Sequence, residues 1–468
     1  MAEQTDAVQA EKKQFYRDVI ALVLPMAAQN LINVAVTSAD VVMLGRVGET
    51  VLSASSLAGQ VQFIMSLIFF GLTSGAAVLT AQYWGKGDTR TIEKVLGITL
   101  RLSLSVAAVF TAAVWLFPYR IMGLFTPEAE VIEYGVQYLK IVSASYLLMS
   151  VTMIYLNVMR SVERVIISTV VYLISLLTNI AVNAVLIFGM FGFPKLGIRG
   201  AAIGTVIART VELVIVLCYA KFVNRDVRLR FRNLFVRDKL LQADFFRYSI
   251  PVTLNELMWG LGSSMNTLII GHLGSSAVAA NSVAQVTRQL ATVIAFGIAN
   301  ATAIMIGKTI GAGDNAKAQR YARRFVRLTW ITGGIGAVII LLIGPIASAT
   351  MALSDTAKEY LTIMMLVMSY FSLFQSYNST MVVGIYRAGG DTKFGLFLDV
   401  TTMWGCSILL GALAAFVFKF PVPVVYILLM SDEIIKLPFT THRYRSKVWL
   451  RNVTREQPPA AENPEAAG

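Results

Sequence analysis

Four polar side chains recur on one face of an apolar segment near the N-terminus. They are Gln29, Asn33, Thr37 and Asp40, at positions i, i+4, i+8 and i+11, which places them along one side of a helix. A charged side chain at the centre of a membrane-spanning helix costs about 2.5 to 3.5 kcal/mol, so such groups are rarely kept without a use. The stripe therefore predicts a helix that faces a cavity, with a carboxylate that can bind a proton or a small cation.

A second stripe follows in the other half of the chain, and its acids are placed differently. The corresponding side chains are Asn255, Trp259, Ser263 and Asn266. The neutral amide of Asn266 stands where the first stripe has Asp40, whereas Glu256 and Asp399 are the acids of the second half. We expect Asp40, Glu256 and Asp399 to bind the cation, with the remaining polar residues lining a cavity. A static buried ion pair is the alternative for each acid.

Other charged residues inside apolar segments suggest partners for these acids. One face of a further segment carries Asn281, Gln285, Arg288 and Gln289. Arg288 is the candidate counter-ion for Glu256 or Asp399. Two other sets have opposite charges three or four residues apart and are interpreted as structural pairs. These sets are Arg209 with Glu212, and Lys436 with Asp432 and Glu433.

The elements that must position these residues come from a tandem duplication. The constant shift that carries Pro25 onto Pro251 also places Gly71 on Gly297, and residues 85–88 (Gly-Lys-Gly-Asp) on residues 311–314 (Gly-Ala-Gly-Asp). The glycines are expected to end helices, and Asp88 and Asp314 to cap the next ones. Duplicated apolar halves are typical of two-lobed membrane transporters.

Composition predicts an all-α polytopic membrane protein. Hydrophobic residues make up 56% of the chain and charged residues 14%, with a mean hydropathy of +0.66. About 20 apolar residues span a bilayer as a helix. Twelve such segments are expected, in two six-helix bundles: 17–44, 52–83, 95–117, 134–158, 165–191, 200–223, 245–270, 278–306, 329–351, 360–386, 394–418 and 424–440. The corresponding parts are an N-terminus (1–16), a first lobe (17–223), a linker (224–244), a second lobe (245–441) and a tail (442–468), partly disordered beyond Val453.

The placement of positive charge indicates orientation and does not indicate nucleic-acid binding. The net charge is +13, and most of the 40 Lys and Arg residues lie on the termini and on alternate loops. This is the positive-inside pattern, which places both termini and the linker in the cytoplasm. The Arg-rich run at 225–239 is interpreted as an orienting signal, with binding of anionic lipid as the alternative.

Several other kinds of site are excluded. Cys218 and Cys406 have no metal-ligand or disulfide-framework spacing, and the two histidines lack a catalytic cluster. A P-loop needs a glycine five residues before Gly307, where this chain has Thr302. We therefore expect no enzyme activity and no cofactor, and we expect transport to be driven by an ion gradient.

The order and spacing of several motifs resemble the multidrug and toxic compound extrusion (MATE) family over nearly the whole chain. Pro25 is followed by Asp40 and then by residues 41–48 (VVMLGRVG), which is similar to the first-helix pattern of the family. Residues 307–314 and 387–392 (RAGGDT) resemble two further family motifs, and Asp399 with Trp404 is similar to helix 11 of many bacterial members.

The resemblance implies a bacterial cytoplasmic-membrane protein that exports organic cations in exchange for H⁺ or Na⁺ by alternating access. In proton-coupled members related to DinF, the first-helix aspartate belongs to a polar network, for which this chain offers Tyr138, Asn157, Asn179 and Thr205. Protonation of Asp40 is then the switch, with Pro25 and Pro251 as hinges. The implied partners are small organic cations and membrane lipid, no nucleic acid is expected, and the chain is expected to be a monomer.

Two positions depart from the family pattern. Many members have an aspartate where this chain has Asn183, which removes a second carboxylate from the first lobe. In Na⁺-coupled members related to NorM, a glutamate stands at the position of Trp259, whereas Glu256 comes three residues earlier. The few acids favour H⁺, and a Na⁺ site near Glu256 and Asp399 is the alternative.

Two other functions remain open. A flippase for lipid-linked or other amphipathic substrates belongs to the same superfamily, but it should have a strongly cationic cavity. A membrane enzyme or receptor should show a catalytic cluster or an added soluble domain.

Overall fold

The computed structural model describes residues 2–350 and 353–455, and within these ranges the regular elements are all helical. The first lobe contains α1 (Ala2–Gly45), α2 (Glu49–Lys86), α3 (Thr89–Leu116), α4 (Pro118–Gly123), α5 (Ala129–Val142), α6 (Ala144–Ser161), α7 (Ile166–Phe188), η1 (Met190–Gly192), α8 (Ile198–Cys218) and η2 (Tyr219–Val223). The linker contains η3 (Phe231–Phe235). The second lobe contains α9 (Lys239–Gly271), α10 (Ser275–Gly311), α11 (Asn315–Thr350), α12 (Asp355–Ser379), η4 (Thr380–Tyr386), α13 (Thr392–Thr402), η5 (Met403–Ile408), α14 (Leu409–Ala412), η6 (Leu413–Val417), α15 (Val422–Leu429) and α16 (Asp432–Arg445).

The predicted fold class is confirmed, and the protein is an integral membrane protein. In lipid, backbone groups must be hydrogen-bonded within their own segment, so the long apolar runs form helices. Eight of the described helices are long and apolar enough to cross a bilayer, or nine if α5 and α6, bent by 51° at their junction, form one span. The expected count of twelve stays a prediction. Several second-lobe segments are interrupted by π-helical turns, and α16 carries Asp432, Glu433 and Lys436.

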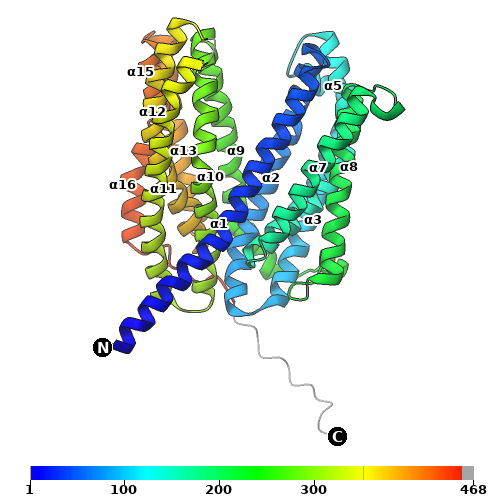
Figure 1. Cartoon of the computed structure of the whole chain (residues 1–468). Helices are drawn as coiled ribbons and strands as arrows, with labels where there is room; N and C mark the ends of the chain where they lie inside the picture. The colour runs from blue at the N-terminus through cyan, green and yellow to red at the C-terminus, as the bar shows by residue number, and fades with distance from the viewer. Residues whose placement is uncertain (1, 351–352, 456–468) are drawn as a thin grey trace.

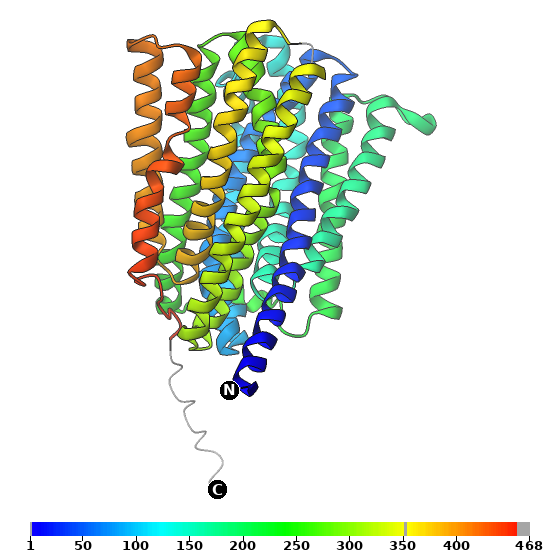
Figure 2. The same cartoon turned by 60° about the vertical axis from the view of Figure 1, so that its left-hand side comes forward.

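The two lobes form a V (Figure 1). They approach each other at the end of the molecule where α1 begins, and they separate toward the opposite end. The view turned by 60° shows the helices of each lobe running between these two ends (Figure 2). We call them the closed end and the open end.

The duplication creates a pseudo-twofold helix crossing at the closed end. A Cβ atom on Gly85 of α2 would overlap the carbonyl of Lys308 of α10, and a Cβ atom on Gly311 would overlap the carbonyl of Gln82. The repeat superposes Gly85 on Gly311 and Gln82 on Lys308, so each contact is the copy of the other. Only glycine lets two backbones approach so closely. The glycines singled out by the repeat thus set the distance between the lobes.

We expect that Gly311→Ala separates the two lobes at the closed end. The added methyl group has no free space against the Gln82 carbonyl, so α2 and α10 must move apart. Spin labels on the two lobes should report a longer distance at this end. Gly334→Ala is the matched control, because no atom lies within 4 Å of a Cβ built there. An unchanged distance in Gly311→Ala would show that this crossing does not limit closure.

The helix caps at the closed end also follow the repeat. The Asp88 carboxylate accepts a hydrogen bond from the Thr91 amide at 3.0 Å, and Asp314 accepts one from the Lys317 amide at 2.8 Å. Both contacts satisfy first-turn amides that have no partner within the helix. The predicted caps of α3 and α11 are confirmed.

The segment after α16 connects the two lobes. Gln82 of the first lobe donates to the Arg451 carbonyl at 3.0 Å and accepts from the Val453 amide at 2.7 Å. The guanidinium of Arg455 is bound to Asp244 at the start of α9. Residues up to 455 are thus packed against the helices. The prediction of disorder beyond Val453 is therefore wrong for Thr454 and Arg455, and the rest of that prediction concerns residues outside the described ranges.

The linker is also ordered. Glu93 of α3 accepts from the Arg228 amide at 2.9 Å and forms an ion pair with Arg230 at 3.2 Å. Helix α9 begins at Lys239, inside the segment expected to be linker. The Arg-rich run therefore packs along the first lobe.

The two prolines lie inside continuous helices, Pro25 in α1 and Pro251 in α9. Proline removes one backbone donor and weakens the helix at that point. The Pro25 carbonyl accepts a hydrogen bond from the Thr169 hydroxyl of α7 at 3.1 Å. Bending at these positions stays a prediction.

Candidate functional site

Each lobe contains a cavity with buried acids. The first-lobe cavity has a volume of about 590 Å³ and is lined by α1, α2 and α5–α8. The second-lobe cavity has a volume of about 390 Å³ and also borders α2 and α6 of the first lobe. The first is lined by, among others, Asn33, Thr37, Asp40, Tyr138, Asn179, Thr205, Arg209 and Glu212. The second is lined by, among others, Phe70, Asn255, Glu256, Trp259, Arg387, Asp399, Glu433 and Lys436.

Asp40 is held by an amide and not by a cation. The Asn183 side chain of α7 donates to the Asp40 carboxylate at 2.7 Å, and to the Asn179 carbonyl oxygen at 3.1 Å. Across the described ranges, no Lys, Arg or His forms an ion pair with Asp40, and the nearby Arg209 is bound to Glu212. One hydrogen bond from a neutral donor leaves acceptor capacity on the carboxylate. Asp40 can therefore accept a proton or a cation without first breaking an ion pair.

We expect that Asn183→Asp moves the pH dependence of transport to higher pH. The new carboxylate would stand within hydrogen-bond distance of Asp40, and two adjacent carboxylates do not both ionise readily, so the pair holds one proton to higher pH. The measurement is the transport rate against pH in reconstituted vesicles. Asn183→Ala removes the amide without adding a carboxyl, and a similar shift in that variant would attribute the effect to the lost hydrogen bond.

The second charged set of the first-lobe cavity is paired internally. Arg209 donates to both oxygens of Glu212, at 2.8 and 2.9 Å, one turn along α8. The predicted pair is confirmed, and it lines the same cavity as Asp40. Asp40 is thus the acid of this cavity that has no cationic partner among the residues described.

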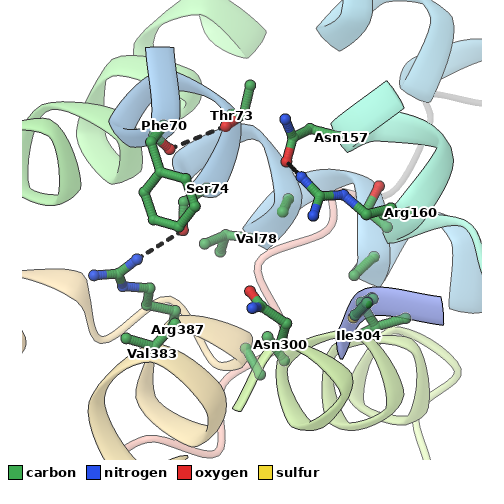
Figure 3. Close-up of a pocket in the computed structure, with 16 residues that line it drawn as sticks. Phe70, Thr73, Ser74, Val78, Asn157, Arg160, Asn300, Ile304, Val383 and Arg387 are labelled. Atoms are coloured by element: carbon green, nitrogen blue, oxygen red, sulfur yellow. Dashed lines mark hydrogen bonds between the residues drawn. The ribbon is translucent and has the colours of Figure 1, made fainter. Parts of the chain in front are cut away.

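One residue of the polar stripe on α1 and one residue of the predicted Asp40 network lie elsewhere. Gln29 is buried between α1 and α7, where it donates to the Thr169 hydroxyl at 3.0 Å. Asn157 accepts a hydrogen bond from Arg160 and lines a third, smaller cavity between the lobes (Figure 3). The polar residues of the stripe on α1 therefore lie in two different environments. Asn33, Thr37 and Asp40 line the first-lobe cavity, whereas Gln29 binds α1 to α7 nearer the closed end.

The predicted counter-ion of the second lobe is wrong. Glu256 forms an ion pair with Arg387 at 2.8 Å, and Asp399 forms one with Lys436 at 3.1 Å. Arg288 instead donates to the carbonyl oxygens of Gln285 at 3.0 Å and Gln375 at 2.8 Å. Arg387 follows η4, and Lys436 lies on α16. The cations that pair with Glu256 and Asp399 are therefore determined by how the other helices pack, and not by position along α10.

The set around Lys436 is larger than an isolated structural pair. Its ammonium lies 3.0 Å from Asp432, 3.2 Å from Glu433 and 3.1 Å from Asp399. Asn255 of α9 also donates to Asp399, at 2.9 Å. One ammonium therefore binds three carboxylates, and together with the Glu256–Arg387 pair the region has more negative than positive charge.

The wall of the second-lobe cavity is largely apolar. It includes Leu67, Phe70, Met153, Trp259 and Phe296. Flat aromatic and flexible methionine side chains bind varied apolar surfaces without directional bonds. An excess of carboxylates within an apolar wall suits an amphipathic organic cation.

Besides Gln29, Asn157 and Asn183, four further predicted lining residues are not among those that border the two cavities. They are Asn266, Asn281, Gln285 and Arg288. Asn281 accepts a hydrogen bond from Tyr426 at 3.2 Å, so it joins α10 to α15. Conversely, Arg387, Gln375 and Asn378 line the second-lobe cavity, although no site role was predicted for them. Two features of the sequence point to Arg387: it is a charge at the end of the apolar segment 360–386, and it begins the family-like motif at residues 387–392.

Within the described residues, no group of three or more His, Cys, Asp or Glu is arranged to hold a metal ion.

Comparison with known proteins gives the family. The MatE family model matches residues 25–185 and 251–413, two stretches that begin at the prolines that the duplication superposes, Pro25 and Pro251. A probable multidrug resistance protein NorM of Rhizobium meliloti is 27% identical, covering 87% of each chain. The NorM of Thermotoga maritima is 23% identical over 96% of each chain, and the uncharacterized transporter YisQ of Bacillus subtilis is 25% identical over 88% of this chain and 90% of YisQ.

Solved structures support the fold. The bent form of the Vibrio cholerae MATE transporter VcmN superposes with a TM-score of 0.83, covering 94% of this chain and 97% of VcmN at 18% identity. A multidrug resistance MATE family transporter described in an outward-facing conformation gives a TM-score of 0.81 over 92% and 96% of the two chains, at 18% identity. The family model matches well over half of the chain, and it matches each half of the repeat separately. The chain therefore belongs to the MatE family of multidrug and toxic compound extrusion transporters.

Proposed function

We propose that the protein is a secondary active multidrug efflux transporter that exchanges organic cations for entering H⁺. Asp40 supports this proposal most strongly, because it is an intramembrane carboxylate whose only described hydrogen-bond partner is an amide. A proton needs one carboxylate, whereas a hard metal cation prefers several oxygen ligands. Na⁺ bound near Glu256 and Asp399 is the alternative coupling ion.

Organic cations are the substrates that the second-lobe cavity favours. Its carboxylates outnumber its cations, and its apolar wall includes Trp259 and Phe296. Charge attraction and apolar contact together recognise amphipathic cations without a fixed shape. Alternating access then requires the lobes to separate at the closed end and approach at the open end.

We further propose that the protein lies in the bacterial cytoplasmic membrane with both termini in the cytoplasm. The distribution of Lys and Arg supports this orientation. The closed end then faces the cytoplasm and the open end faces outward. We expect a monomer, because one chain supplies both lobes.

The proposal is tested by accumulation of a fluorescent organic cation in bacteria that lack their own efflux pumps. Cells that express the protein should accumulate less dye, and a protonophore should remove the difference. Unchanged accumulation would contradict multidrug export. A flippase would instead move a labelled lipid-linked sugar across vesicles that contain the purified protein.

A further inference from the structure

Arg387 lies where the two lobes meet above the closed end. It follows the π-helical segment η4, and its side chain is 5% exposed. It borders both the second-lobe cavity and the small cavity of about 60 Å³ between the lobes. We call this small cavity the floor cavity (Figure 3). Arg387 therefore belongs at once to the binding region and to the contact between the lobes.

The guanidinium of Arg387 connects one acid of the second lobe to the first lobe. One nitrogen donates to the Glu256 carboxylate of α9 at 2.8 Å, and another donates to the Ser74 hydroxyl of α2 at 2.8 Å. Figure 3 shows the contact with Ser74 across the floor cavity. A planar guanidinium presents several donors in fixed directions, so it can hold both partners together.

Another guanidinium, that of Arg160, borders the same floor cavity from the first lobe (Figure 3). Its described side-chain partners are the neutral amides Asn157 and Gln29. None of the residues that line the floor cavity is an acid. Arg387 is therefore compensated by Glu256, whereas no acid is among the described side-chain partners of Arg160.

We propose that Arg387 is an inter-lobe latch whose hold on Ser74 depends on the negative charge of Glu256. When a proton or a substrate cation neutralises Glu256, the buried guanidinium keeps only a neutral hydroxyl partner. A buried charge without its counter-ion is strongly unfavourable, and repulsion from Arg160 is no longer offset. Separation of α2 from Arg387 admits water to the floor cavity and opens the closed end. This inference rests on the proposed function, because it makes loading of the second lobe the signal for opening.

Other charged groups near Glu256 are already engaged. Asp399 and Glu433 both lie within ion-pair distance of Lys436. Among the residues that line the second-lobe cavity, Arg387 is the only other cation. Neutralising Asp399 thus changes the charge of the cavity without removing the partner of Arg387.

The latch has no equivalent in the other half of the repeat. The backbone turn that follows each helix matches Arg387 with Arg160, since the Gly390 amide donates to the Arg387 carbonyl as the Glu163 amide donates to the Arg160 carbonyl. The positions that correspond to Glu256 and Ser74 are Asn30 and Asn300, so the first half has the arginine but lacks the acid. The repeat therefore places one charged latch, from the second lobe onto the first. Neutralisation of Glu256 in the second lobe should therefore open the closed end directly. Asp40 is bound to Asn183 of its own lobe and has no described contact with the opposite lobe.

The test is a distance measurement at the closed end. Arg90→Cys and Ala316→Cys place one spin label on each lobe at positions related by the repeat, in a background with Cys218→Ser and Cys406→Ser. In nanodiscs without substrate, Glu256→Gln should raise the ratio of the long to the short distance about tenfold or more, since loss of one buried ion-pair partner greatly exceeds the roughly 1.4 kcal/mol that a factor of ten represents. Asp399→Asn is the matched control and should leave the ratio nearly unchanged.

Two further variants test the mechanism. Ser74→Ala should also raise the ratio, and in combination with Glu256→Gln it should add little, because both act on one contact. Glu256→Asp should retain most of the short distance. An unchanged ratio in Glu256→Gln, or an equal rise in Asp399→Asn, would overturn the latch. Since the measurement needs no transport, a failure of the proposed function would appear separately, in the transport assay.

Discussion

Replacement of Asp40 with asparagine is expected to abolish proton-driven export while leaving the fold intact. Asparagine has nearly the same shape but does not titrate, so the first-lobe cavity loses its group for carrying a proton. It can still form a hydrogen bond with Asn183. The free energy of unfolding should therefore change by only about 1 kcal/mol or less. The measurements are transport rate and melting temperature of purified protein.

Thr37→Val is the matched control for Asp40→Asn. It alters a neighbouring polar residue of the same cavity, whose hydroxyl donates to the Asn33 carbonyl within α1. It should keep proton-driven transport. An Asp40→Asn variant that still responds to a pH gradient would contradict the role of Asp40.

Replacement of Lys436 with methionine is expected to cause the largest loss of stability. The ammonium is 5% exposed and lies within 3.2 Å of Asp399, Asp432 and Glu433. Its removal leaves several carboxylates without compensation, which typically costs about 3 to 5 kcal/mol. The melting temperature should fall by several degrees or more.

The pH dependence of that loss has a defined sign. Protonation neutralises the carboxylates that Lys436 no longer binds, so the deficit relative to wild type should shrink as the pH falls. Lys447→Met is the control, because Lys447 is exposed. A deficit that stays constant between pH 8 and about pH 4 would indicate lost packing and not lost charge compensation.

Much of the architecture could be predicted because the repeat is visible in the sequence. The constant shift between the two halves identified Gly85 and Gly311, and the structure places both in one pseudo-twofold crossing. The apolar runs indicated the all-helical class, since lipid allows few other backbones. The number of spans was harder to predict from the sequence, because η4, η5 and the α15–α16 junction interrupt the later apolar segments.

The acids of the site were predictable, but their partners were not. Asp40, Glu256 and Asp399 stood out because charge inside an apolar segment is costly. The partners of Glu256 and Asp399 are set by which helices pack together. Arg387, which follows η4, binds Glu256 of α9, and Lys436 of α16 binds Asp399 of α13. Arg288 was chosen from a helical face alone, and its neighbours on α10 and α12 are amides.

The central claim is most directly tested by transport in liposomes that contain the purified protein. Movement of a fluorescent organic cation would be followed under an imposed pH gradient and, separately, under an imposed Na⁺ gradient, with wild type beside Asp40→Asn. We predict transport that is driven by the pH gradient and lost in Asp40→Asn. Transport driven only by Na⁺ and unaffected by Asp40→Asn would contradict this account and place coupling at Glu256 and Asp399.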